Sequence, residues 1–145
     1  MVNNWEFQNK VFDESMIGNN YGFIYLLKIK DLQGNISWYY GKKAFTHKKK
    51  TKLSKKARVG TRKRVSITKK SSGWENYQGS CKPLLEAFKT KKVRLVNKEI
   101  IKLCPDRSSL AYWETHYLCV NEVLFSDLYW NSNVSSRYFK GKISK

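Results

Sequence analysis

The sequence is poor in acidic residues, cysteine and proline, and it has no long apolar segment. Of its 145 residues, 11 are Asp or Glu, three are Cys and two are Pro. The three cysteines (Cys81, Cys104 and Cys119) are odd in number and show no CxxC spacing. We therefore expect neither a disulfide framework nor a zinc site, and we expect buried, reduced thiols. No apolar run approaches the roughly 20 residues that span a bilayer, so we expect no membrane partner.

The length and composition predict one globular domain. Hydrophobic residues make up 41% of the chain and aromatic residues 14%. A chain of this size buries roughly two thirds of its unfolded surface, so it can form a real core. We expect residues 1–20 to form an irregular lead-in and residues 21–145 to form the domain.

The positive charge is concentrated in one segment. The 29 Lys and Arg residues give a formal charge of +18, and 14 of them lie within residues 42–70, where there is no acid. This segment has few large apolar residues, so we predict an exposed arm with at most one helical turn, near residues 53–59. A nucleic acid is the expected partner, because lysine-to-phosphate contacts bind it with salt-sensitive, sequence-independent affinity. A localisation signal or a solvated loop is the alternative. The residues expected to contact the nucleic acid are Lys43, His47, Lys48, Lys49, Lys50, Lys52, Lys55, Lys56, Arg64, Lys69 and Lys70.

The pattern along the rest of the chain predicts a small α+β fold. Residues 21–30 and 36–43 are rich in aromatic and branched side chains and flank a turn, as in a hairpin. Ile24 and Leu26 make the first strand apolar on both faces, which indicates a central position. Further elements are a helix over 83–90, a strand over 93–103 and a helix over 110–124. We therefore expect a mainly antiparallel three-stranded sheet, the N-terminal hairpin plus one later strand, flanked by helices and carrying the long basic arm.

One carboxylate lies among apolar residues on the last predicted helix. The neighbours of Glu114 at helical spacing are Leu110, Ala111, Tyr117 and Leu118. Because burying an unpaired charge is costly, such a group is normally paired, protonated or bound to a metal. The alternatives are an ordinary salt bridge to Lys or Arg, or a helix rotated toward solvent. Glu99 on the predicted third strand is a weaker rival.

Tyrosines cluster on the predicted hairpin. Tyr25 lies on the first strand, and Tyr39 and Tyr40 lead directly into Gly41, Lys42 and Lys43. A phenol beside an ammonium group has a lowered pKa, which makes it a better proton acceptor at neutral pH. Simple packing in the core is the alternative.

These residues resemble a known family. Phe23-Ile24-Tyr25 followed by Tyr39-Tyr40-Gly41 resembles the paired GIY and YIG motifs of the GIY-YIG nuclease superfamily, with Phe23 in place of Gly and Tyr40 in place of Ile. In that family the two motifs lie on adjacent strands, a later helix carries an acidic metal ligand, and an Asn follows. Glu114 and Asn131 occupy the matching positions. The YGKK and 74–80 stretches look most like small phage-encoded members related to homing endonucleases.

The resemblance implies a divalent-metal-dependent endonuclease of the homing or restriction-like phage type that hydrolyses phosphodiester bonds of double-stranded DNA. By that resemblance Glu114 would hold Mg²⁺ or Mn²⁺, and Tyr25 or Tyr39 would be the general base, with its pKa lowered by Lys42. Asn131 would orient Glu114 or a water, and an arginine of the arm, Arg58 or Arg62, would neutralise the phosphate. The enzyme would work inside the cell, in the host cytoplasm if phage-encoded. If it cuts both strands, it would act either as a homodimer or by nicking the two strands in sequence.

A second hypothesis is a basic nucleic-acid-binding protein without catalysis. The arm fits it equally well. Trp38, Trp74 or Tyr77 would then stack on the bases of a single strand. The two hypotheses differ in Glu114, because a pure binding protein has no need of a buried carboxylate facing phosphate.

Overall fold

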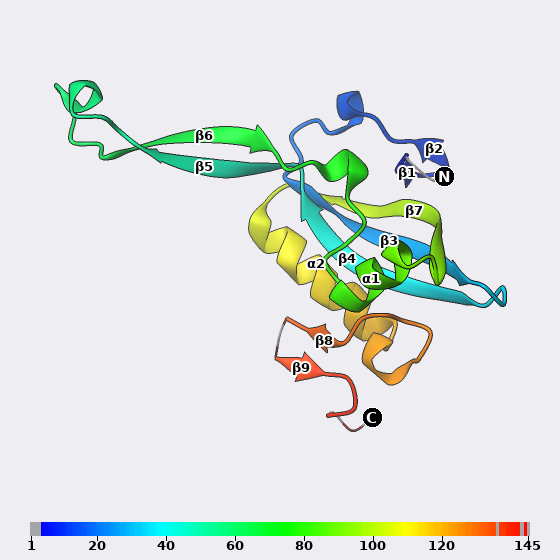
Figure 1. Ribbon diagram of the computed structural model, residues 1–145. Coiled ribbons are helices and arrows are strands. Elements are labelled where there is room, and N and C mark those ends of the chain that lie inside the picture. Colours follow the sequence, from blue (N-terminus) through cyan, green and yellow to red (C-terminus); the bar gives the residue numbers. More distant parts are fainter. Residues whose placement is uncertain (1–3, 136, 143, 145) are drawn as a thin grey trace.

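The computed structural model describes residues 4–135, 137–142 and 144, and at its centre lies a five-stranded mixed sheet (Figure 1). The strands follow one another across the sheet in the order β2-β1-β7-β3-β4. Their bounds are β1 Glu6–Phe7, β2 Lys10–Val11, β3 Gly22–Asp31, β4 Ile36–Ala44 and β7 Val93–Cys104. Strand β3 runs antiparallel to both β4 and β7, whereas β1 runs parallel to β7. The expected central position of the first long strand is confirmed, and β4 forms one edge of the sheet.

The expected three-stranded sheet is wrong, because the N-terminal segment adds two short strands. Trp5 and Phe12 flank these strands and are buried in the same core as β3. The backbone N–H of Phe12 donates to the carbonyl of Trp5 at 2.8 Å, which closes the small β1–β2 turn. Strands of two residues show no alternation of their own, and they join the sheet because β1 pairs with β7 and β2 pairs with β1. Residues 1–3 of the predicted lead-in lie outside the described residues.

The two helices cover opposite faces of the sheet. Alternate residues of β3 point to each side, so that Tyr25 packs in one cluster with Leu84 of α1 (Lys82–Lys89), while Ile24 packs with Leu110 of α2 (Arg107–Val120). Helix α2 begins earlier than expected because the Asp106 carboxylate caps it by accepting from the backbone N–H of Ser109 at 2.7 Å. In the part of the chain described here, no helix is both long and apolar enough to cross a membrane.

Single turns of 3₁₀ helix link the larger elements, and a short hairpin ends the described chain. The turns are η1 Glu14–Met16, η2 Lys56–Arg58, η3 Trp74–Asn76 and η4 Val123–Phe125, and the hairpin pairs β8 Asn133–Val134 with β9 Tyr138–Phe139. Of the three thiols, Cys104 is buried as expected, whereas Cys81 is half-buried and Cys119 is exposed.

The two departures from the GIY and YIG motifs are aromatic residues that fill the two cores. The Phe23 ring lies 5.0 Å from Trp5 and 5.1 Å from Phe45, on the α1 side. Tyr40 stacks between Tyr117 and Tyr129 on the α2 side, with ring centres 6.2 and 5.9 Å away. Larger side chains at both motif positions therefore serve packing.

The basic segment forms a two-stranded antiparallel hairpin that projects from the body of the molecule (Figure 1). Its strands are β5 (Thr46–Lys52) and β6 (Val65–Ser71), and η2 near the tip is the single helical turn expected there. Lys42 and Lys43 belong to β4, so the projecting part begins after Phe45. We refer to residues 46–71 as the ribbon.

Candidate active site

A cavity of about 810 Å³ opens at the β4 edge of the sheet. Its walls come from β3, β4, the start of α1, the middle of α2 and the segment 130–135. Five of the residues predicted to be functional line it together, namely Tyr25, Tyr39, Lys42, Glu114 and Asn131. Glu99, the rival carboxylate, does not line this cavity and lies on β7 beside Phe7 and Gln8 instead.

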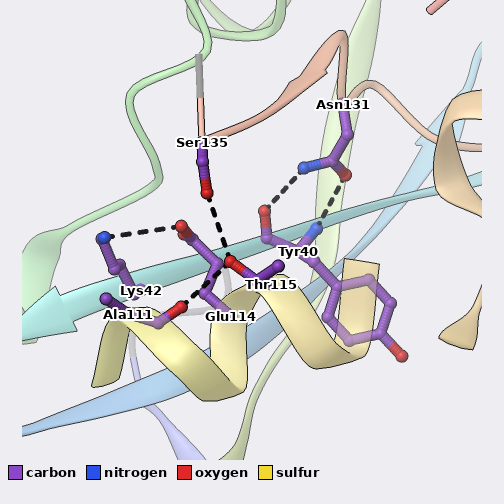
Figure 2. A network of polar contacts seen from close by, with 7 residues as sticks. All are labelled: Tyr40, Lys42, Ala111, Glu114, Thr115, Asn131 and Ser135. Carbon is purple, nitrogen blue, oxygen red and sulfur yellow. Dashed lines mark hydrogen bonds and ion pairs between the residues drawn. The ribbon is translucent and has the colours of Figure 1, made fainter. Parts of the chain in front are cut away.

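Glu114 of α2 is partly buried, as its helical spacing predicted, and it faces Lys42 near the end of β4. Its side chain is 19% exposed, and its Oε1 lies 3.5 Å from the Nζ of Lys42 (Figure 2). Burial raises the pKa of Glu114 above its ordinary value, and the nearby Lys42 ammonium partly offsets this effect. The Lys42 side chain is 42% exposed, so this ion pair is open to solvent on one side and to a ligand in the cavity.

Tyr25 lies at the back of the cavity against the backbone of β4. Its side chain is 1% exposed, and a Cβ at Gly41 would overlap its hydroxyl. Gly41, the shared glycine of the motif, is therefore required for this close approach. Burial raises the pKa of Tyr25 well above its usual value, and its hydroxyl is hydrogen-bonded to Tyr77 in a way that also favours the protonated form.

Tyr39 is closer to solvent than Tyr25 and has a different hydrogen-bond partner. Burial raises the pKa of Tyr39, but a hydrogen bond from the Ser80 side chain opposes this rise by stabilising the phenolate. Lys42 was expected to lower the pKa of one of these phenols, and that expectation is wrong. Its ammonium pairs with Glu114, and the pKa values of both tyrosines are raised.

Asn131 forms two hydrogen bonds with the backbone of Tyr40 (Figure 2). The Tyr40 N–H donates to Oδ1 at 3.1 Å, and Nδ2 donates to the Tyr40 carbonyl at 2.9 Å. Because β4 is an edge strand, this amide replaces the strand that would otherwise satisfy these groups. Residues just before Asn131 also pair with the backbone of this edge strand. The Trp38 N–H donates to the Leu128 carbonyl, and the Trp130 N–H donates to the Trp38 carbonyl. Asn131 thus holds the β4 segment between Tyr39 and Lys42.

The two arginines predicted to be catalytic are not at this cavity. Arg58 lies in η2 near the tip of the ribbon, where its Nε donates to the Leu53 carbonyl at 3.0 Å, and Arg62 follows in the same loop. Lys82, which the sequence analysis missed, lines the cavity instead. It is the first residue of α1, and the following Pro83, a residue common in the first turn of helices, was its signal in the sequence.

The residues expected to contact DNA lie mainly along the ribbon. Lys43 is the exception, since its Nζ lies over the Tyr77 ring, 4.1 Å from its centre. The others are exposed on β5, on β6 or in the loop between them, and they are His47, Lys48, Lys49, Lys50, Lys52, Lys55, Lys56, Arg64, Lys69 and Lys70.

The donor set at the cavity fits a weakly coordinated Mg²⁺ or Mn²⁺. Within the described residues, no group of three or more His, Cys, Asp or Glu side chains could enclose a metal ion. Mg²⁺ is commonly held by one or two carboxylates with waters and substrate phosphates as the other ligands. The partly exposed Glu114 carboxylate meets this requirement. The Asn131 amide is bound to Tyr40 on both sides and is not a suitable ligand.

Comparison with known families gives one match over most of the chain. The model described as "Putative endonuclease segE, GIY-YIG domain" matches residues 5–134. No curated protein and no solved structure gives a significant match. The matched range contains the five-stranded sheet, both helices and the five predicted residues that line the cavity together.

Proposed function

Because the chain belongs to the GIY-YIG domain family of segE endonucleases, we propose that it hydrolyses phosphodiester bonds of double-stranded DNA with the help of a divalent metal. The observation that carries this proposal is the Glu114–Lys42 pair at 3.5 Å, which faces the same cavity as Tyr39. A binding protein would need neither the costly carboxylate nor the phenol beside it. The family and the phage-type motifs further support a role as a homing or restriction-like phage enzyme.

In this proposal Glu114 would hold Mg²⁺ or Mn²⁺, which would supply neutralisation of the negative charge that develops on the phosphate during cleavage. Lys42 and Lys82 place two ammonium groups at the cavity, where they neutralise further charge on the phosphate. Lys82 thereby takes the role that the resemblance gave to an arginine of the arm.

We assign the role of general base to Tyr39 rather than to Tyr25. The Tyr39 phenol is half-buried where Tyr25 is fully buried, and its hydrogen bond with the Ser80 side chain favours the phenolate and partly offsets the rise of its pKa on burial. The Tyr25 hydroxyl is buried and bonded to Tyr77, which holds its proton in place. Tyr39 would accept the proton of the attacking water, and Tyr25 would fix the shape of β4 behind it. Asn131 acts as a positioning residue for the same strand.

The experiment that tests this function is nicking of a supercoiled plasmid by the wild type and by Glu114→Gln, with and without Mg²⁺. We expect magnesium-dependent nicking by the wild type and none by the variant, while DNA affinity stays within a few-fold because phosphate contacts elsewhere carry binding. Cleavage by Glu114→Gln at the wild-type rate would contradict the assignment. DNA binding without nicking by the wild type would favour the non-catalytic alternative.

Folding of the variant is checked by its melting temperature. Burial raises the pKa of Glu114, which means that the folded protein binds a proton there more readily than the unfolded chain does. Ionisation at neutral pH therefore costs stability, and a neutral Gln removes that cost. We expect Glu114→Gln to melt at or above the wild-type temperature at pH 7, so a loss of nicking would not reflect unfolding.

A further inference from the structure

The ribbon is a two-stranded structure in which almost every side chain is free of the core. All seven residues of β5 are exposed, and Ser66 is the single half-buried residue of β6. At about 3.3 Å per residue, each strand is roughly 23 Å long. The backbone N–H of Leu53 donates to the Arg64 carbonyl at 3.0 Å, which extends the pairing toward the tip.

The ribbon carries strong electrostatic repulsion of its own. Across the strands Lys48 lies directly opposite Lys69, and residues 47–70 hold 12 Lys and Arg residues and no acid. Like charges in directly opposed positions destabilise a sheet, and an isolated two-stranded hairpin is marginal in water. A polyanion beside these side chains would screen that repulsion, so binding of a polyanion should stabilise the ribbon.

The base of the ribbon is fixed to the catalytic body. Phe45, which immediately precedes β5, is 3% exposed, and its ring lies 5.3 Å from that of Trp74, just after β6. The Phe45 N–H donates to Tyr21 O, and the Ser72 N–H donates to Phe45 O, both at 3.0 Å. Only Phe45 separates β5 from β4, the strand that carries Tyr39 and Lys42. The ribbon therefore has a defined position relative to the cavity.

The register gives the ribbon two chemically different faces. One face carries the cross-strand pairs His47–Lys70, Lys49–Thr68 and Thr51–Ser66, and every member of these pairs can form hydrogen bonds. The opposite face carries the pairs Lys48–Lys69, Lys50–Ile67 and Lys52–Val65, which combine lysines with apolar residues. We name the first the polar face and the second the lysine face.

We propose, given the DNA endonuclease function above, that the ribbon enters the major groove and that its polar face reads base edges. The major groove is about 12 Å wide and admits a two-stranded β-ribbon, and each base pair there presents a distinct pattern of donors and acceptors. The short Thr51, Ser66 and Thr68 side chains allow close approach to the bases. The long stems of Lys48, Lys50 and Lys52 reach from the other face to phosphates at the groove rims. The ribbon is thus a specificity element in addition to a source of general affinity.

The test measures binding in the cleavage-deficient Glu114→Gln background, so that it does not depend on catalysis. Preferred sequences are first selected from randomised duplexes. Binding to the selected duplex is then compared for two triple variants, Thr51→Val/Ser66→Ala/Thr68→Val on the polar face and Lys48→Gln/Lys50→Gln/Lys52→Gln on the lysine face. Valine keeps the branched shape that suits a strand, which makes the first set a test of the hydroxyls.

We expect the polar-face variant to lose at least about fivefold of its preference for the selected sequence with an unchanged salt dependence. The lysine-face variant should weaken binding to all sequences alike and reduce the slope of log K against log salt by up to about 2.7. Replacing purines of the selected site by 7-deazapurines, which lack the N7 acceptor of the major groove, should also abolish the preference.

The proposal is overturned if selection yields no preferred sequence, or if the polar-face variant and the 7-deaza duplex keep the full preference. Equal or tighter binding to double-stranded RNA would also overturn it, because the deep, narrow major groove of RNA does not admit side chains. Selective binding by a protein that never nicks DNA would remove the proposed function and leave the ribbon proposal intact. Magnesium-dependent nicking at random sequences would support the proposed function and overturn the ribbon proposal.

Discussion

The carboxyl group of Glu114 is subject to two opposed influences, burial and the Lys42 ammonium 3.5 Å away. Burial is the stronger one, so its pKa lies above the ordinary value of 4.5. The ionised form, which a divalent cation requires, is therefore lost as pH falls through this raised pKa. Lys42 limits the loss by favouring the ionised form.

Lys42→Met should raise the pKa of Glu114 further, since it removes the one nearby charge that lowers it. The measurement is a carbon-13 NMR titration of the glutamate carboxyl groups, with the Glu114 signal assigned by its absence in Glu114→Gln. Lys43→Met is the matched control, because Lys43 lies over the Tyr77 ring instead. An unchanged titration midpoint in Lys42→Met would show that the ion pair does not form in solution.

The second prediction at this scale separates the two tyrosines. A base with a raised pKa is mostly protonated at neutral pH, so the cleavage rate should rise with pH above 7 as Tyr39 loses its proton. Tyr39→Phe should lower the rate by on the order of 10²–10⁴ and abolish this rise. Tyr25→Phe should retain the rise, because its hydroxyl is bonded to Tyr77 at the back of the cavity. If the pH–rate profiles show that Tyr25→Phe abolishes the rise and Tyr39→Phe retains it, Tyr25 is the general base instead of Tyr39.

At the scale of elements, the edge strand β4 depends on a segment far away in the sequence. Trp38 and Tyr40 exchange backbone hydrogen bonds with residues 128–131, where the Asn131 side chain serves as the last partner. This cover closes an edge that would otherwise expose N–H and C=O groups, and it fixes the strand that presents Tyr39 and Lys42 to the cavity.

Asn131→Ala should lower the free energy of unfolding by about 1–3 kcal/mol, because it leaves the buried N–H and C=O of Tyr40 without partners. We also expect kcat to fall more than DNA affinity, since the variant disturbs the position of β4 and no phosphate contact. Urea unfolding and single-turnover cleavage measure the two effects. Asn133→Ala, at the same cavity, is the control and should lower both the free energy of unfolding and kcat by less than Asn131→Ala does. Equal losses in both variants would contradict the positioning role.

At the scale of the whole molecule, the ribbon leaves the body and returns to it at one place. Thr46 pairs with Ser71, and the core anchors Phe45 and Trp74 lie just outside them. The intervening residues 47–70 hold 12 of the 29 basic residues and no acid. These residues contribute +12 of the formal net charge of +18, so the body provides the packed core and the ribbon provides most of the net positive charge.

Replacing residues 47–70 by the dipeptide Asn-Gly, which suits a tight hairpin turn, should leave the melting temperature nearly unchanged. The slope of log K against log salt should become shallower by several units, at about 0.9 for each phosphate that the ribbon neutralises in the wild type. Slow magnesium-dependent nicking should persist at low salt, since the cavity residues all lie outside the deletion. A large fall in melting temperature would show that the ribbon supports the core.

The sequence by itself determined the features that depend on local interactions. The β3–β4 turn follows from Asp31, whose carboxylate accepts from the backbone N–H groups of Gln33 and Asn35 at 2.9 and 2.8 Å. The partial burial of Glu114 follows from its helical spacing to the apolar residues around it. Each of these features depends on interactions within a few residues of the chain, so the local residue pattern is enough to predict it.

Only the tertiary structure decided the features that depend on distant segments. Strands β1 and β2 are too short to show a pattern, and they belong to the sheet because β1 pairs with the distant strand β7 and β2 pairs with β1. The Lys42–Glu114 pair and the bonds of Asn131 to Tyr40 join residues 72 and 91 positions apart. The basic segment became a ribbon although lysine is a weak strand former, because its two ends are held together by Phe45 and Trp74 in the core. Long-range packing therefore set the shape of the site and of the ribbon, and local sequence could not encode either.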